Sequence, residues 1–401
     1  MANKKFSEFT TQTDTANVQF VVGFNGSDNV KITPANLTGG GGGASDLNGL
    51  SDCLVTAQFS QFIGNVPPSV TSGSAYYNTS LGHDTFENLT GGGNNTMLGF
   101  EAGYALTTNN DNTVIGSQAL RSSNPAKVVA VGRFAGNASS GNNTVLIGYQ
   151  AGRVNTNSGH VSVGYQAGYS QTSGADNTNV GYETGRSNTT GGQRTCVGYR
   201  AGKDNTGVSN TFIGRSAGSV SSTGSNNVVV GSNCMAFAAI GTQNVAIGVQ
   251  AAQSATGNYN AIVGYQAGQY MTSGSNNTFL GFESGRNVTT GTFNTAIGND
   301  ALKSEDAGGR NTAIGGYALT SLNGSVVGFN TSVGYESGLL VSNGVQNTFL
   351  GGYAGNSVTT GDNNTIIGYD ADSSSATVDN EITLGNSSVT ALRFPVTISR
   401  L

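Results

Sequence analysis

Charged residues are scarce in this chain of 401 residues: they make up 10% of it, and lysine and arginine together number 17. A soluble globular domain typically has about 25% charged residues. The fold must therefore rest on hydrogen-bond ladders and packing, because ion pairs can contribute little. The few basic side chains and the net charge of −5 also exclude the basic stripe that binding a phosphate backbone requires. We expect no nucleic-acid partner.

Cysteine and long apolar runs are also sparse. The three cysteines, Cys53, Cys196 and Cys234, are odd in number and unrelated in position, so we expect free thiols. No run of about 18 apolar residues occurs, and no apolar segment of the kind found in signal peptides follows Met1–Glu8. We expect a protein that is made in a cytosol without a signal peptide and does not insert into a membrane.

Glycine, in contrast, is abundant, with 62 residues, but it follows no three-residue period, which excludes collagen. It recurs in a phrase of asparagine, threonine, an aliphatic residue, glycine, two further residues and a small residue, as in Asn277–Gly285 and Asn294–Leu302. The first glycine of the phrase lies at 82, 99, 116, 132, 148, 164, 181, 198, 214, 231, 248, 264, 281, 298, 315, 334, 351, 368 and 385. Of the 18 intervals, 12 are 17 residues, 5 are 16 and one is 19. Such regularity indicates a repeat architecture.

Aligning the 19 copies turns each position of the repeat into a column with its own physical requirement. The residue before the glycine is Leu, Ile or Val in every copy, and we expect this column to be buried. Three residues after the glycine the side chain is always small, and it is alanine in 13 copies, which indicates a close approach. Four residues before the glycine stands asparagine in 14 copies, which predicts a stacked amide ladder. The glycine itself predicts a turn with positive φ or a close backbone approach.

The period and composition predict an all-β fold, a parallel β-solenoid (β-roll) of about 19 coils with a 16–17 residue period. Sixteen or seventeen residues are too few for a two-helix repeat and suit a coil of two short strands and two tight corners. One coil offers only one large aliphatic position and one alanine-sized position, which is little core for a single chain. We therefore expect an intertwined or side-by-side homotrimer.

The chain outside the array divides into short segments. Phe20, Val22 and Phe24 alternate with other residues, turn residues follow, and Val30 and Ile32 alternate again, which predicts a hairpin. The predicted organisation is an N-terminal attachment module (1–38), a glycine-rich linker (39–45), a neck (46–76), the repeat shaft (77–385) and a C-terminal cap or tip strand (386–401). The 19-residue interval predicts a loop at 321–325.

Candidate chemistry in the sequence is weak. His83 and His160 lie in different columns, which is no pattern for a metal site, and turn or exposed positions are expected for them. No calcium-binding nonapeptide occurs in the array, although pieces such as Gly361-Asp362 could hold an ion. Glu283 and Asp300 occupy adjacent coils, and their carboxyls could lie about 5 Å apart, as in a retaining glycosidase. Asp84 and Glu101 share that relation, so a solvated column produces such pairs by chance. We expect no catalytic residue, no metal and no cofactor.

An aromatic column follows the repeat glycine by one residue. Its tyrosines are Tyr149, Tyr165, Tyr182, Tyr199, Tyr265, Tyr335 and Tyr369, joined by Phe100 and Phe282. Such a ladder could stack on the sugars of a glycan or pack between the chains of a trimer, and packing is the favoured interpretation. A threonine column that includes Thr278 and Thr295 is similar to that of ice-binding solenoids. One threonine per coil does not make their flat two-column face.

Units such as Ala296–Ala301 make the array resemble the head repeats of trimeric autotransporter adhesins, which implies a left-handed parallel β-roll assembled as a homotrimer. The segments Phe20–Phe24, Asn29–Leu37 and Ile382–Arg393 resemble parts of tail-fibre and other virion structural proteins of tailed phages, notably marine ones. That resemblance implies attachment through the N-terminus to virion tail or adaptor proteins, and contact with a host surface glycan or protein. In those relatives the last segment often precedes a self-cleaving chaperone, which we expect to be absent or removed here.

These observations together predict a structural fibre protein of a phage virion, synthesised in the host cytoplasm and located in the tail, that serves host adsorption. Three alternatives remain open: a capsid or neck fibre without a receptor role, a bacterial cell-surface adhesin, and a polysaccharide-cleaving tailspike. The missing signal peptide argues against the adhesin, and the lack of an acidic cluster argues against the tailspike.

Overall fold

The structure, a computed structural model, describes residues 20–24, 29–32, 53–55, 60–64, 75–220, 222–324 and 327–393, with the backbone alone for 20–24, 29–32, 53–55 and Gly64. Its regular elements are β-strands, and the described residues contain no helix. None of the described segments is therefore a helix that could cross a membrane. The chain divides into two units, Met1–Val154 and Asn155–Leu401, which we describe one at a time.

The strands are short. Those of the first unit are β1 (Phe20–Phe24), β2 (Asn29–Ile32), β3 (Cys53–Val55), β4 (Gln61–Gly64), β5 (Thr79–Gly82), β6 (Thr96–Leu98), β7 (Thr113–Ile115), β8 (Val128–Val131) and β9 (Thr144–Ile147). The strand β10 (Val154–Asn155) falls at the boundary. Those of the second unit are β11 (Val161–Val163), β12 (Ser170–Gln171), β13 (Thr178–Val180), β14 (Thr195–Val197), β15 (Thr211–Ile213), β16 (Val228–Val230), β17 (Val245–Ile247), β18 (Ala261–Val263), β19 (Thr278–Leu280), β20 (Thr295–Ile297), β21 (Thr312–Ile314), β22 (Thr331–Val333), β23 (Thr348–Leu350), β24 (Thr365–Ile367) and β25 (Ile382–Leu384).

The predicted N-terminal hairpin is confirmed. Strands β1 and β2 pair antiparallel, with Phe20 opposite Ile32 and an irregularity between Val21 and Phe24. The linker at 39–45 and the remainder of the attachment module lie outside the described residues. The module's function therefore stays a prediction.

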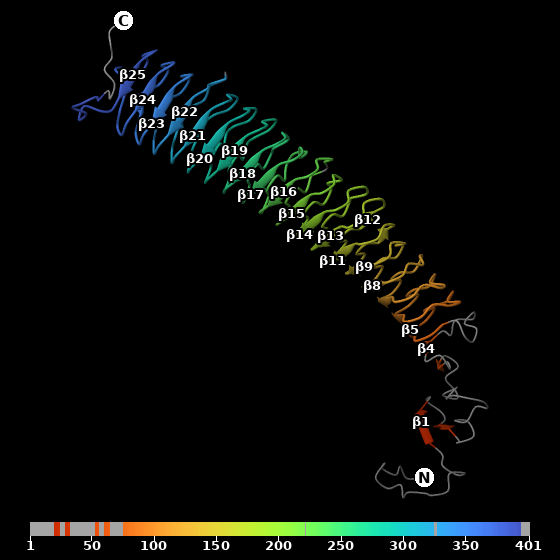
Figure 1. Ribbon diagram of the computed structural model, residues 1–401. Helices are drawn as coiled ribbons and strands as arrows, with labels where there is room; N and C mark the ends of the chain where they lie inside the picture. The colour runs from red at the N-terminus through yellow and green to blue at the C-terminus, as the bar shows by residue number, and fades with distance from the viewer. Residues whose placement is uncertain are drawn as a thin grey trace, which may run out of the picture. The chain divides into compact units, whose positions relative to one another are not determined.

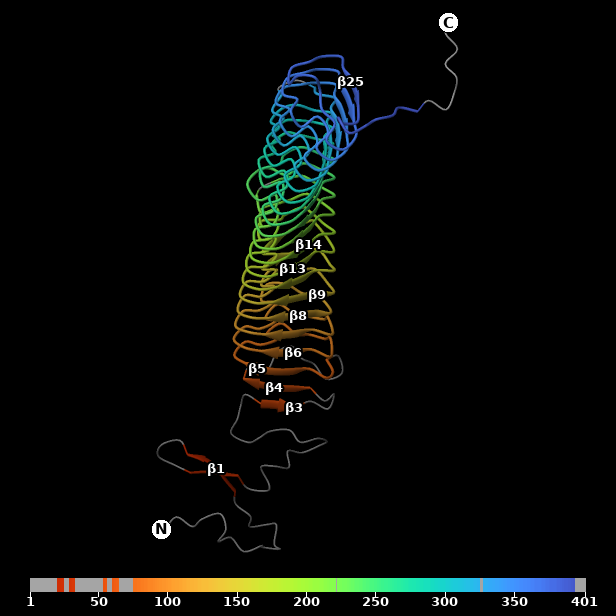
Figure 2. The same ribbon diagram turned by 90° about the vertical axis from the view of Figure 1, so that its left-hand side faces the viewer.

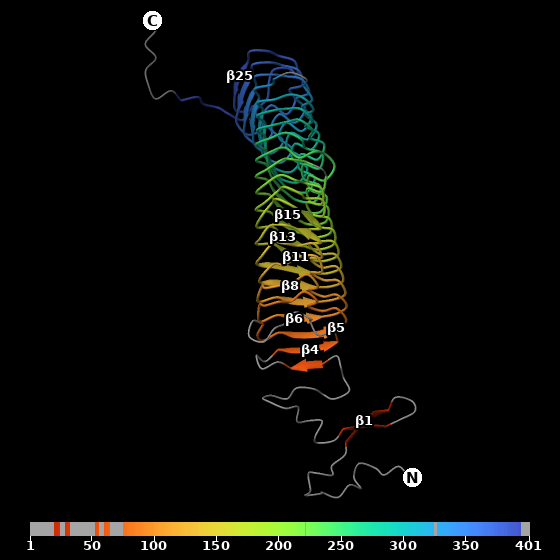
Figure 3. The same cartoon turned by 90° about the vertical axis from the view of Figure 1, so that its right-hand side faces the viewer.

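Each unit contains a parallel ladder with one strand per coil, which confirms the predicted parallel β-solenoid. In the second unit Thr278 of β19 lies opposite Thr295 of β20, and Thr295 lies opposite Thr312 of β21. Figures 1 and 2 show strands of neighbouring coils side by side in this unit, and Figure 3 shows β5, β6 and β8 arranged as rungs in the first unit.

The ladder of the first unit begins earlier than predicted. Strand β4 pairs parallel with β5, with Gly64 opposite Gly82. Phe62 is fully buried, and the residues two before the repeat glycines from Gly82 to Gly368 are buried as well, while Thr383 before Gly385 is only partly buried. Residues 61–64 thus form a rung of the solenoid, whereas the sequence predicted a neck there.

Most coils have one strand, whereas the sequence predicted two. The reason is the number of left-handed backbone positions, which bend the chain at short intervals. In one coil these are Asp300 (φ 54°), Leu302 (φ 51°) and Arg310 (φ 61°), in addition to Gly298 (φ 138°). Turns of this kind leave room for a strand of three or four residues on one side of the coil.

The aliphatic column before the repeat glycine is not buried in the chain, so that prediction is wrong. In β19 the side chains of Thr278 and Leu280 face outward and Phe279 is buried between them. Leu280 and Leu350 are each 47% exposed. Side chains alternate along a strand, so the residue two before the glycine faces inward and fills the coil.

The small column after the glycine is part of the core from Thr85 to Ala371, while Ser388, its last member, is exposed. Ala267 and Ala301 are fully buried. Val288 and Val341, which stand seven residues after a repeat glycine on the wall of the coil opposite the strand, are fully buried as well. The alanine column therefore packs inside the single chain and contributes nothing to the contact between chains that the predicted trimer requires.

The predicted asparagine ladder is confirmed. The backbone N–H of Asn294 donates to Asn277 Oδ1 (2.9 Å), and that of Asn311 donates to Asn294 Oδ1 (3.0 Å). The other end of each amide reaches the next coil, as Asn277 Nδ2 donates to Gly291 O (2.9 Å). These asparagines are buried, so the ladder satisfies backbone groups that water cannot reach.

The repeat glycine is required for two reasons that act together. Gly298 has φ 138°, a conformation that side chains disfavour. A Cβ at this position would lie 2.4 Å from the carbonyl oxygen of Gly315 in the next coil. Both alternatives of the sequence interpretation, positive φ and close approach, are correct at this position.

The end of the array contains less regular structure than predicted. Residues 386–393 form no strand, and the apolar alternation at 394, 396 and 398 lies outside the described residues. In the 19-residue interval, residues 322–324 have no regular structure, in agreement with the predicted loop, while 325 and 326 lie outside the described residues.

Candidate functional site

Three of the predicted tyrosines form a stack on the outside of the second unit. The rings of Tyr165 and Tyr182 are 4.9 Å apart, and those of Tyr182 and Tyr199 are 5.2 Å apart, with interplanar angles of 8° and 10°. Each ring comes from the residue after a repeat glycine, so the ring spacing follows the spacing of about 4.8 Å between paired strands. The repeat thus places the rings at stacking distance.

The other predicted tyrosines lie in different arrangements. Tyr265 stacks on Phe282 at 5.3 Å. Tyr149, in the first unit, meets Phe134 edge-on at 6.3 Å. The seven tyrosines therefore do not form one continuous ladder.

Two aromatic residues that the sequence interpretation missed join Tyr335 and Tyr369. Tyr317 meets Tyr335 at 5.9 Å, Tyr335 meets Tyr353 at 5.6 Å, and Tyr353 meets Tyr369 at 5.8 Å, all edge-to-face. Tyr317 and Tyr353 stand two residues after the glycine, in a column that was considered only for its polar members. Their alternation with Tyr335 and Tyr369 in successive coils was the available signal.

The aromatic column and the outward aliphatic column are separated by the repeat glycine alone. We call their exposed members in the second unit the apolar stripe. It comprises Tyr165, Tyr182, Tyr199, Ile213, Ile247, Val249, Tyr265, Leu280, Phe282, Tyr335, Leu350, Ile367, Tyr369 and Leu384. Exposure of these side chains ranges from 36% for Ile367 to 68% for Tyr369. The stripe recurs with the period of the repeat on the outer surface of this unit.

The polar column beside the stripe is a network of ion pairs. Lys303 Nζ lies 2.6 Å from Glu283 Oε2 and 3.2 Å from Asp300 Oδ1, and Arg286 Nη1 lies 3.3 Å from Glu283 Oε2. Burial alone would raise the pKa of Glu283, but the hydrogen bond from Lys303 and the charge of Arg286 outweigh it and lower that pKa. Glu283 is therefore held as a carboxylate, which is the opposite of what a general acid needs.

Glu183 forms a similar network one coil after Tyr165. Arg200 Nε lies 2.8 Å from Glu183 Oε2, and Lys203 Nζ lies 3.7 Å from the same atom. Like Glu283, Glu183 is thus paired with cationic side chains, here from the following coil.

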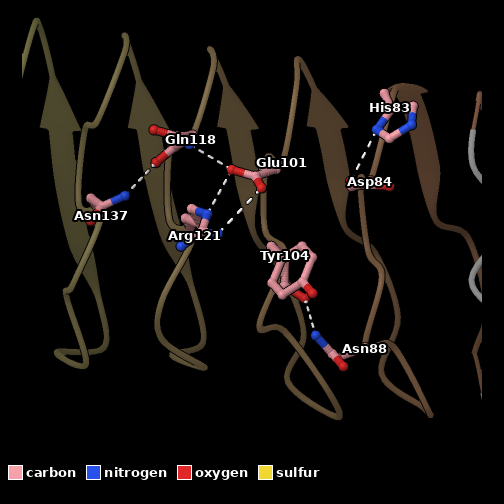
Figure 4. Close-up of polar contacts among 8 residues, drawn as sticks. All are labelled: His83, Asp84, Asn88, Glu101, Tyr104, Gln118, Arg121 and Asn137. Atoms are coloured by element: carbon pink, nitrogen blue, oxygen red, sulfur yellow. Dashed lines mark hydrogen bonds and ion pairs between the residues drawn. The ribbon is translucent and has the colours of Figure 1, made fainter.

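In the first unit, Asp84 and Glu101 also lie beside basic side chains (Figure 4). Arg121 Nε donates to Glu101 Oε2 at 2.6 Å, and Gln118 Nε2 donates to the same oxygen at 2.6 Å. The hydrogen bond from Arg121 lowers the pKa of Glu101. Asp84 lies 3.0 Å from His83 Nδ1, so the two carboxylates have separate partners.

The two histidines occupy different environments. His83 is exposed and stacks near Phe100. His160, for which a turn or exposed position was expected, is fully buried in the asparagine column, where its Nδ1 accepts a hydrogen bond from the backbone N–H of Asn177 (3.3 Å). Its place four residues before Gly164 already indicated that column.

The remaining candidates for ion or thiol chemistry have ordinary structural roles. Asp362 Oδ1 accepts a hydrogen bond from the backbone N–H of Val345 (2.8 Å), so it belongs to a corner ladder. Within the described ranges, no three His, Cys, Asp or Glu side chains are grouped as metal ligands would be. Cys196 and Cys234 are buried free thiols, as predicted, while the side chain of Cys53 is outside the description.

The candidate attachment residues lie on the N-terminal hairpin. Phe20, Val22 and Phe24 belong to β1, and Val30 and Ile32 belong to β2. Only the backbone is described there, so their role in attachment stays a prediction.

Comparison with known proteins leaves these features to be interpreted from the chain itself. No protein-family model matches the sequence, and no curated protein matches it significantly.

Proposed function

We propose that the chain is a structural fibre protein of a phage virion, anchored through its N-terminal segment and projecting a homotrimeric β-solenoid toward the host surface. The repeat fold supports this proposal, because within each unit every coil stacks on the one before it and extends the ladder without requiring a large core. The ion pairs of Glu183 and Glu283 also favour a structural role for the face beside the stripe, since both carboxylates are occupied by cationic side chains.

The observation that carries the proposal is the apolar stripe. Soluble monomers rarely expose contiguous apolar patches larger than a few hundred Å². Here the repeat places an aliphatic or aromatic side chain on the outside of coil after coil, with Leu280 47% and Phe282 48% exposed. Threefold association of three such stripes removes them from water and closes the assembly.

The stacking geometry favours packing between chains over binding of sugars. A sugar ring binds to the face of an aromatic ring, but both faces of Tyr182 are covered, one by Tyr165 and one by Tyr199. The stack offers ring edges and hydroxyl groups, which suit the side chains of a neighbouring chain. Host contact by this fibre is therefore assigned to parts other than the tyrosine stack.

Light scattering on the purified full chain tests the trimer. We expect a mass near three times 40.6 kDa. The double variant Leu280→Asp with Leu350→Asp places charges in the stripe at positions that are exposed in the single chain. It should remain folded by circular dichroism and scatter as a single chain, because an unpaired carboxylate in an apolar interface is strongly unfavourable.

The matched control is Thr290→Asp with Thr360→Asp, two exposed threonines of the same two coils. This variant adds the same charge outside the stripe and should keep the mass of the unmodified protein. A well-folded monomer of the unmodified chain at micromolar concentration would contradict the trimer, as would a stripe variant that keeps the trimer mass.

A further inference from the structure

The interior of the first coils of the second unit is polar. Ser162 and Asn179 are fully buried in the inward column that Phe212 and Phe279 fill farther along the chain. Gln171, 1% exposed, lies on the opposite wall. In the coil of β14, Arg194 stands in the column that holds asparagine in most other coils, and it is also 1% exposed. The apolar cluster of this unit accordingly begins only at Cys196.

These polar side chains converge. Ser162 lies opposite Asn179 in the parallel ladder, and Asn179 lies opposite Cys196. A Cβ placed on Gly168 would be 2.4 Å from Ser162 Oγ, 3.1 Å from Asn179 Nδ2 and 3.2 Å from Gln171 Nε2, so the three groups surround one point of the inner wall. Ser162 and Asn179 are also smaller than the phenylalanines of the same column.

Many buried hydrogen-bonding atoms of this segment have no hydrogen-bond partner, and most of these atoms are donors. Buried atoms without a partner include Arg194 Nε and Nη1, Asn205 Nδ2, Ser162 Oγ and both amide ends of Asn179 and Gln171. Buried polar atoms in folded proteins are nearly always hydrogen-bonded, to protein or to a bound species. A cluster of unfilled groups in one stretch of core therefore indicates an occupant.

The charge of Arg194 narrows the choice of occupant. Its Nη2 donates to Gly202 O at 3.0 Å and lies 3.5 Å from Cys196 Sγ. None of the ion pairs formed by the described residues includes Arg194. A guanidinium remains protonated in proteins, and a buried one without a counter-charge is strongly unfavourable.

The neighbouring thiol does not supply the counter-charge. Burial raises the pKa of Cys196, although the charge and hydrogen bond of Arg194 act in the opposite direction. The thiol is therefore neutral near pH 7. Water could hydrogen-bond to the atoms that lack a partner, but it could not balance the charge of Arg194.

We propose that the interior of these coils binds a small monovalent anion of the halide class, held by Nε and Nη1 of Arg194 and taken up as the chain folds. The unpartnered amides of Asn179 and Gln171 solvate the same interior. A halide fits the donor-rich surroundings and the narrow coil better than an oxyanion, which brings several acceptor oxygens and needs more room. This site is independent of the fibre role and of the oligomeric state.

Thermal unfolding of the full chain at constant ionic strength tests the site. With sodium chloride replacing sodium gluconate, the unfolding midpoint should rise as chloride increases, because a ligand bound by the folded state alone stabilises it. The variant Arg194→Asn restores the usual residue of the column and should lose this chloride dependence. The control Arg215→Asn removes the same charge from an exposed position and should retain it.

Crystals of the unmodified protein grown in bromide give the second readout. The anomalous signal of bromide should place an ion within hydrogen-bond distance of Arg194 Nε or Nη1. If Arg194→Asn does not fold, the bromide position alone decides. An absent bromide peak at Arg194 would overturn the proposal, as would equal chloride dependence in the unmodified protein and in Arg194→Asn.

Discussion

At the residue scale, Glu305 is a buried acid at a position that the neighbouring coils fill with apolar side chains. In other coils the equivalent wall position holds Met271, Val288, Leu322 or Val341. Glu305 is 1% exposed, and its Oε1 accepts a hydrogen bond from the backbone N–H of Gly308 (2.8 Å). Burial raises its pKa to about 7. Between pH 4.5 and about 7, Glu305 therefore holds a proton in the folded chain and has lost it in the unfolded chain.

This difference predicts a pH-dependent stability with a definite sign. Between pH 4.5 and about 7 the folded state binds more protons than the unfolded state, so the contribution of Glu305 to stability falls as pH rises. The loss across this window is ~3 kcal/mol, at 1.36 kcal/mol for each pKa unit. Urea denaturation at a series of pH values measures it.

The variants Glu305→Gln and Glu305→Val isolate this effect. Both should remove the fall in stability relative to the unmodified protein, and the isosteric glutamine keeps the shape of the side chain. Carboxylates with lowered pKa, such as Glu101 and Glu283, contribute in the opposite direction, so the comparison is between each variant and the unmodified chain. Parallel pH profiles for the unmodified chain and Glu305→Gln would contradict the prediction.

At the scale of the element, the sequence predicted the features that recur in coil after coil, but it did not predict which face of each strand is buried. The parallel ladder, the asparagine ladder and the repeat glycine follow from residues that recur at a fixed spacing. Which side chains of each strand face inward could not be predicted, because many coils have apolar residues both one and two positions before the glycine. Ala296 and Ile297 are such a pair, and a strand of three residues is too short for alternation to decide which of them is buried.

The stack of coils predicts how the array tolerates deletions. Removing the 17 residues Asn294–Arg310 brings Asn311 onto Asn277 and Gly315 onto Gly281, so every column stays in register. Removing only the eight residues Asn294–Ala301 places unlike residues in the inward column. We expect cooperative unfolding near the original temperature for the first deletion and loss of β structure for the second, measured by circular dichroism.

The control for these deletions is a second full-period removal, of Asn277–Phe293, which also preserves the columns. It should behave like the deletion of Asn294–Arg310. If the full-period deletions unfold the array as thoroughly as the eight-residue deletion, the columns are not what holds the coils together.

At the scale of the whole molecule, two proposed functions depend on different segments. The side chains of the apolar stripe lie within the described residues, and their exposure supports the proposed association between chains. The proposed attachment involves β1, β2 and residues outside the described ranges, and it rests on the resemblance of the N-terminal segment to virion proteins. The sequence could locate both segments from periodicity and composition, but it could not show that the alanine column faces inward.

Deleting Met1–Thr38 separates the two functions. The remaining chain should still fold and associate, since the parallel ladders do not include β1 or β2. Virions assembled with the shortened chain should lack the protein when their composition is measured by gel electrophoresis or mass spectrometry. Normal amounts of it in the particle would instead place the attachment site within the solenoid or its C-terminal end.

The spacing of the hydrogen bonds between coils has a consequence for how quickly the chain can fold. Bonds such as Asn294 N–H to Asn277 Oδ1 join residues 17 positions apart. Divided by the chain length of 401 residues, this separation corresponds to a relative contact order of about 0.04. That value lies below the roughly 0.07–0.12 of helical bundles, although the protein is all-β. Each coil needs only the coil before it as a template, so folding can keep pace with synthesis as the chain leaves the ribosome.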